Sequence, residues 1–88
     1  MPENQSKLRK RIQNEKQFKN WKPRPEGGRI YWLEIEGKFG WKARYVKQVD
    51  EAEETVSFRQ EIYNEFDELV EIHEKYPVDK GHIKLKEK

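Results

Sequence analysis

Hydrophobic and polar residues alternate along residues 29–49, and this alternation predicts a β-hairpin. Two runs rich in aromatic and β-branched residues, 29–36 and 41–49, flank a short link with Gly37 at one end and Gly40 at the other. Neither run is polar along one whole side. We therefore expect a small antiparallel sheet that is half covered and shows an aromatic, partly basic face.

Residues 55–76 fit two patterns. As one amphipathic helix ended by Pro77, they bring hydrophobic positions three or four residues apart onto one side: Phe58, Ile62, Phe66, Leu69 and His73. As a second hairpin, 55–63 and 69–76 become strands of a four-stranded antiparallel meander. The periodicity and the lack of glycine between the two runs favour the helix, so the predicted fold is α+β, with this helix packed on the sheet.

The rest of the chain divides at residue 24. Residues 1–24 predict a basic N-terminal arm or helix, whose apolar stripe consists of Leu8 and Ile12 and needs a surface to dock against. Residues 25–88 predict a single small globular domain, and 82–86 within it a short edge strand protected by lysines.

Composition narrows the class of protein. The chain has 88 residues, of which 33% are hydrophobic and 41% charged, so its core is expected to be thin. It has no cysteine, no apolar run long enough for a membrane span and no secretory signal, which predicts a cytoplasmic protein without membrane contact. Heavy use of lysine and glutamate is typical of thermophile proteins.

The small net charge of +2 conceals two opposed blocks. Residues 1–24 carry eight Lys/Arg against two Glu, and residues 50–77 carry ten Asp/Glu against two Lys/Arg. Such an acidic segment can receive a basic protein partner or the basic arm of a neighbouring copy. One function consistent with this layout is a protein-interaction or self-assembling adaptor, with a protein partner or a homo-oligomer.

Cations and aromatic rings are interleaved in the first half of the chain, which indicates a different function. Lysine and arginine neutralise phosphates, and exposed rings stack on unpaired bases. The pattern predicts a non-enzymatic binding module for RNA or single-stranded DNA, although large rings in so small a domain also serve as core. The candidate binding residues are Arg9, Lys10, Arg11, Trp21, Arg24, Arg29, Trp32, Trp41, Lys42, Arg44 and Tyr45.

Candidate chemistry is confined to His73, His82 and Arg59. The two histidines are nine residues apart, which matches no metal-ligand or catalytic signature, so we expect no metal, no cofactor and no enzyme. A histidine, a proline and a second histidine after an aromatic strand resemble the tail of TumE-type toxin nucleases, over less than a quarter of the chain and without that group's denser histidine cluster. The resemblance implies a toxin-like small ribonuclease, which would need His73, His82 and Arg59 close together.

Overall fold

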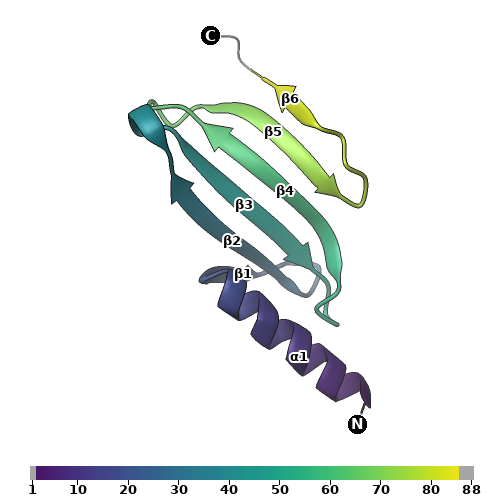
Figure 1. The fold of residues 1–88 in the computed structure, drawn as a ribbon. Helices are drawn as coiled ribbons and strands as arrows, with labels where there is room; N and C mark the ends of the chain where they lie inside the picture. Colours follow the sequence, from purple (N-terminus) through teal and green to yellow (C-terminus); the bar gives the residue numbers. More distant parts are fainter. Residues whose placement is uncertain (1, 86–88) are drawn as a thin grey trace.

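One helix and one antiparallel sheet make up the fold. A computed structural model describes residues 2–85 and is shown as a ribbon in Figure 1. The elements in chain order are α1 (Pro2–Gln17), β1 (Asn20–Pro23), β2 (Arg29–Glu36), the short 3-10 turn η1 (Lys38–Gly40), β3 (Lys42–Val49), β4 (Thr55–Tyr63), β5 (Leu69–Tyr76) and β6 (His82–Lys84). The six strands follow the order β1-β2-β3-β4-β5-β6, so each pairs with its neighbour in the sequence.

The α+β class with an antiparallel sheet is confirmed in its broad form, and the helix over 55–76 is wrong. That segment forms β4 and β5, and these have the bounds of the two strands in the meander alternative. The sheet has six strands, however, where that alternative has four. A strand at the predicted C-terminal edge is present as β6, which covers 82–84 of the predicted 82–86; residue 86 lies outside the described residues.

A turn made without glycine explains the error. Between β4 and β5, Asn64 Oδ1 accepts the backbone N–H groups of Phe66 (2.9 Å) and Glu68 (3.0 Å). Asp67 adopts a left-handed conformation with a φ of 62°. Asparagine and aspartate tolerate this conformation and hydrogen-bond their own turn, so they close a hairpin where glycine was expected.

The same turn occurs between β3 and β4. Asp50 Oδ1 accepts the N–H groups of Ala52 (2.9 Å) and Glu54 (3.0 Å), and Glu53 has a φ of 62°. In sequence the two loops are Asp-Glu-Ala-Glu-Glu and Asn-Glu-Phe-Asp-Glu. A short acidic motif that begins with Asp or Asn therefore makes both hairpins.

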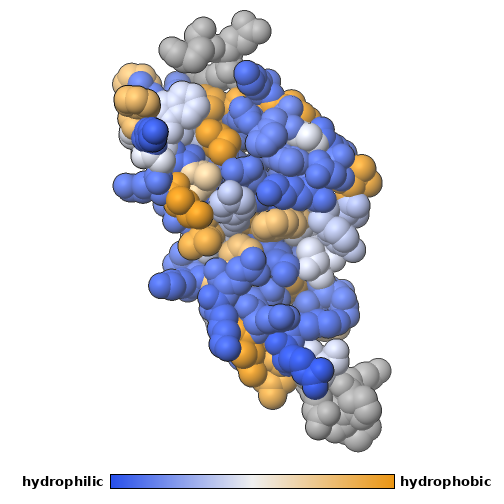
Figure 2. All heavy atoms as spheres, in the orientation of Figure 1, coloured by the Kyte–Doolittle hydropathy of each residue, from blue (hydrophilic) through white to orange (hydrophobic). Residues whose placement is uncertain are grey.

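The core lies where α1 meets one face of the sheet, here called the near face. Phe18, which is 2% exposed, packs with Tyr31 and Val49, and partly buried Leu33, Tyr45 and Phe58 surround these three. Leu8 and Ile12 do not dock as predicted. Both lie exposed on α1, and Figure 2 shows hydrophobic atoms at the surface over this helix.

A buried carboxylate fastens α1 to the sheet. Glu53 is only 5% exposed, and its Oε1 accepts hydrogen bonds from Tyr31 Oη (2.8 Å) and Asn14 Nδ2 (3.2 Å). The amide oxygen of Asn14 accepts a further bond from Lys47 Nζ (2.8 Å). Helix, hairpin and strand thus meet at one polar point, and the buried polar groups there have partners.

Most of the sheet has no second layer formed by residues 2–85. The molecule measures 52 × 24 × 21 Å, and α1 lies at one end of the sheet, beside the β3–β4 turn (Figure 1). The opposite face, here called the far face, is not covered by the helix. No helix among residues 2–85 is long and apolar enough to cross a membrane.

We expect Phe18→Ala to remove on the order of 3–5 kcal/mol from the free energy of unfolding, because it deletes the ring at the centre of a thin core. Urea unfolding followed by tryptophan fluorescence measures this change. Phe39→Ala is the matched control, since that ring is 89% exposed and its loss should cost less than about 0.5 kcal/mol. Equal losses in the two variants would contradict a core centred on Phe18.

Tyr31 should ionise late. Burial raises the pKa of Tyr31 to about 12, and its hydrogen bond to the Glu53 carboxylate acts in the same direction. Because the folded state holds this proton more tightly than the unfolded chain, the stabilisation is complete below about pH 10 and is lost as the pH rises through about 12. In a titration followed by phenolate absorbance, the wild type should therefore show one more tyrosine ionising near pH 12 than Tyr31→Phe does. In denaturant this difference should move to about pH 10.

Candidate nucleic-acid interface

The alternation of side chains along the strands separates the predicted binding residues onto two faces. In the β2–β3 register Trp32 lies opposite Val46, and Leu33 lies opposite Tyr45. Neighbouring residues on a strand point to opposite faces, so Tyr45 belongs to the near face and Trp32 to the far face. The predicted basic-aromatic surface is therefore not one continuous side of the molecule.

The far face carries a hollow of about 440 Å³, here called the sheet hollow. It brings Trp32 and Arg44, two of the predicted residues, together with Tyr63, whose ring centroid lies 5.4 Å from the Arg44 guanidinium carbon. The complete lining is Lys22, Ile30, Trp32, Arg44, Val46, Gln48, Arg59, Glu61 and Tyr63. Sequence reasoning missed Tyr63 because it placed this residue in a helix; the alternation along 55–63 was the signal that could have found it.

Carboxylates already pair with the cations of the far face. Arg44 Nε donates to Glu34 Oε2 at 2.9 Å, and this hydrogen bond lowers the pKa of Glu34. Arg59 Nε lies 2.6 Å from Glu61 Oε2. Arg44 is thus held across the β2–β3 pair and Arg59 along β4, and the charge of both arginines is locally balanced.

The predicted cations at the β1–β2 edge are also engaged. The Arg29 guanidinium carbon sits 3.7 Å from the ring centroid of Trp21, and its Nη1 donates to Glu15 Oε2 at 2.8 Å. Arg24 Nη1 donates to the Val49 carbonyl oxygen at 2.9 Å. Arg29 therefore links the edge of the sheet to α1, and Arg24 links the β1–β2 connection to the end of β3.

Trp41 and Lys42 lie at the opposite end of the sheet from α1, beside the β4–β5 turn. Trp41 Nε1 donates to Glu65 Oε1 at 2.8 Å, and Lys42 Nζ lies 3.0 Å from Asp67 Oδ1. The structure thus separates these two predicted residues from those near the helix.

A set of cations on α1 and β1 has no acidic partner among residues 6–85. Residues 7–22 carry seven Lys/Arg against the single Glu15. Lys10 pairs with Glu54, and Arg11 Nε lies 3.4 Å from Glu15 Oε2. The remainder, here called the helix-end cations, are Lys7, Arg9, Lys16, Lys19 and Lys22, all exposed.

The acidic β3–β4 turn receives the basic arm of its own chain. Lys10 reaches Glu54, and Asn14 reaches Glu53, both across the junction between α1 and the sheet. The predicted complementarity between the two charge blocks is thus partly used within one molecule.

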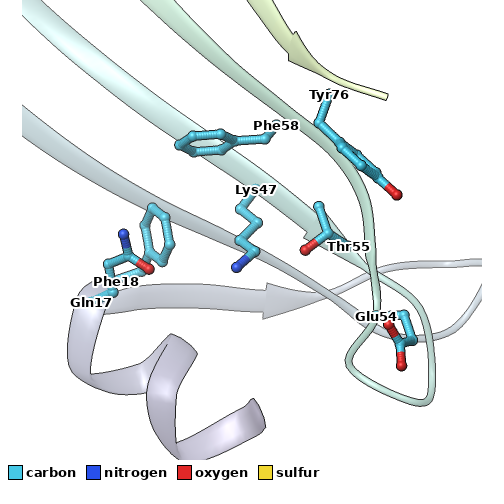
Figure 3. Close-up of a pocket in the computed structure, with 7 residues that line it drawn as sticks. All are labelled: Gln17, Phe18, Lys47, Glu54, Thr55, Phe58 and Tyr76. Carbon is cyan, nitrogen blue, oxygen red and sulfur yellow. The ribbon is translucent and has the colours of Figure 1, made fainter. Parts of the chain in front are cut away.

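A second hollow, of about 380 Å³, lies between α1 and the near face (Figure 3). Figure 3 shows Lys47 extending from its strand toward the helix, with Phe18 and Phe58 on one side and Thr55 on the other. Burial lowers the pKa of Lys47. Its ammonium group donates a hydrogen bond to Asn14 Oδ1, so this lysine links the sheet to α1 and serves packing between them. Gln17, Glu54 and Tyr76 complete the lining.

The two histidines lie together, and Arg59 lies apart from them. His73 Nδ1 is 3.1 Å from His82 Nε2, and their ring centroids are 4.3 Å apart. Gln60 lies opposite His73 in the β4–β5 register, so its neighbour Arg59 points to the far face, away from the histidines. The three residues that the ribonuclease hypothesis requires are thus not assembled at one place.

Scans against protein-family models, curated proteins and solved structures find no match to this chain. Its function is therefore inferred from the residues and contacts described above.

Proposed function

We propose that the protein is a non-enzymatic module that binds single-stranded nucleic acid, RNA or single-stranded DNA. The observation that carries the proposal is the set of helix-end cations, which are exposed and unpaired among residues 6–85 at the end of the molecule formed by α1 and β1. Cations of this kind attract a phosphate backbone and release its counterions on binding.

The sheet hollow supports the choice of a single strand. Unpaired bases stack on accessible rings, and the hollow offers the half-buried rings of Trp32 and Tyr63 on a face that α1 does not cover. Lys22 belongs both to the helix-end cations and to the hollow lining, so the phosphate-binding and base-binding parts adjoin at β1. Because the charges inside the hollow are balanced, we expect the helix-end cations to make the contacts with the phosphate backbone of the nucleic acid.

Reversing two helix-end charges should weaken binding and flatten its salt dependence. We expect Lys16→Glu/Lys19→Glu to lower the affinity for a fluorescent 20-nucleotide poly-uridine by at least about tenfold at low salt. Two lost phosphate contacts should make the slope of log K against log salt shallower by about 1.4. Fluorescence anisotropy titrations at several salt concentrations measure both quantities.

The matched control is Lys38→Glu/Lys80→Glu, which changes the net charge equally at cations outside α1 and β1. It should alter the affinity less than about threefold, since it affects only the overall field. The proposal fails if the wild type does not bind at low salt, if its affinity is independent of salt, or if both double variants weaken binding equally.

Trp32→Ala should remove the stacking surface. We expect a loss of about 1–3 kcal/mol in binding free energy, or roughly 5- to 150-fold, for poly-uridine. An abasic strand with the same phosphates has no base to stack, so the wild type and Trp32→Ala should bind it with equal affinity. Trp41→Ala, at the distant β2–β3 turn, is the control; a loss as large as that of Trp32→Ala would assign the effect to folding.

A further inference from the structure

Away from the candidate nucleic-acid interface, two carboxylates and the two histidines of the chain form a row on β5, β6 and the loop between them. His73 and His82 are opposite each other in the β5–β6 register. His73 Nε2 lies 2.6 Å from Asp79 Oδ1, and at the other end of the row His82 Nδ1 faces Glu71 Oε2. The inner nitrogens, His73 Nδ1 and His82 Nε2, are 3.1 Å apart.

Hydrogen-bond chemistry decides where the ring protons lie. An ionised carboxylate only accepts hydrogen bonds, so a ring nitrogen that faces one must carry a hydrogen. Asp79 therefore places the proton of His73 on Nε2, and Glu71 places that of His82 on Nδ1. When both rings are neutral, the two inner nitrogens present lone pairs to each other, so either a proton or a metal ion between them is needed to make the contact favourable.

The loop between the strands is built to hold Asp79 in this role. The backbone N–H of Gly81 donates to Asp79 Oδ1 at 2.9 Å, and Gly81 has a φ of 70°, a conformation that favours glycine. The carboxylate is thus held by the loop backbone and aimed at the outer nitrogen of His73.

The separation of the inner nitrogens suits a metal ion. At a metal–nitrogen distance of about 2.05 Å, two ligands of a tetrahedral ion are about 3.3 Å apart, and two adjacent ligands of a square-planar ion about 2.9 Å apart. The observed 3.1 Å lies between these values. Histidines that bind metals also donate their other ring N–H to a carboxylate, as both rings do here.

We propose that His73 and His82 together bind one divalent transition metal ion of the class that prefers imidazole, such as Zn²⁺, Ni²⁺ or Cu²⁺. Asp79 and Glu71 position the two rings. They do not ligate the ion themselves, so the protein supplies two ligands; among residues 2–85 no group of three or more histidine or acidic side chains is placed to hold a metal ion. His82 is exposed, so the ion enters from solvent and water completes its coordination.

Such an ion would join an edge strand to the sheet. β6 is only three residues long, and all three are exposed. A metal held by one ring from β5 and one from β6 adds a link between these strands, and a ligand that binds only the folded state raises stability.

The test uses the full chain, titrated with Zn²⁺ in a calorimeter and followed by two-dimensional ¹H–¹⁵N NMR of the imidazole rings. The chain has only two histidines, so each ring can be assigned from one single-histidine variant. We expect one Zn²⁺ per chain and the largest ¹⁵N shifts at His73 Nδ1 and His82 Nε2. Mg²⁺, which prefers oxygen ligands, should produce neither effect.

Variants separate the ligands from the positioning groups. His73→Ala and His82→Ala should each weaken Zn²⁺ binding by at least tenfold, and Asp79→Asn by about tenfold. Lys84→Ala, a neighbouring change on β6, should leave the affinity within about twofold. The proposal is overturned if Zn²⁺ does not bind, if either histidine variant retains the wild-type affinity, or if the shifts fall on the outer nitrogens; the NMR result on the wild type holds even if a variant folds poorly.

Discussion

The burial of the Glu53 carboxylate is the constraint on which the arrangement of helix and sheet depends. A buried charge is costly unless it is hydrogen-bonded or paired, and here Tyr31 and Asn14 supply the donors. Arg29 contributes a guanidinium whose Nε lies 4.0 Å from Glu53 Oε2. Because these donors come from α1 and β2 and the acceptor from the β3–β4 turn, the carboxylate is satisfied only when all three meet. This requirement places Phe18 over the sheet.

Local backbone chemistry places Glu53 at that point. The Asp50 side chain closes the turn by accepting two backbone N–H groups, and the left-handed conformation of Glu53 directs its side chain back toward the core. In the related β4–β5 turn the corresponding residue is Asp67, which is exposed and pairs with Lys42 instead. The same turn motif thus supplies a buried carboxylate where it faces the core and a surface ion pair where it faces solvent.

A sheet covered at only one end leaves both faces available for polar pairing. The far face uses this freedom for one ion pair across strands, Arg44–Glu34, and one along β4, Arg59–Glu61, so its arginines are fixed beside Trp32 and Tyr63 in a hollow with balanced charge. The helix-end cations have no acidic partner among residues 6–85, because Asn14 of α1 and the adjoining Phe18 dock on the sheet and most of the lysines of α1 point outward. The molecule therefore separates charge from aromatic surface, and β1 is where the two meet.

The sequence by itself determined the class of the fold, the hairpin over residues 29–49 and the basic character of the N-terminal segment. These depend on alternation, turn residues and charge counts, which are local properties. For 55–76 the periodicity favoured a helix, which is wrong, because hydrophobic residues on both faces of a thin sheet also repeat at helical spacing, and only pairing with β3 selects the strands. Nor did local pattern show that Leu8 and Ile12 stay exposed while Asn14 docks, or that His73 and His82 meet. Those outcomes depend on partners distant in the chain, and only the tertiary structure brings such partners within hydrogen-bonding range.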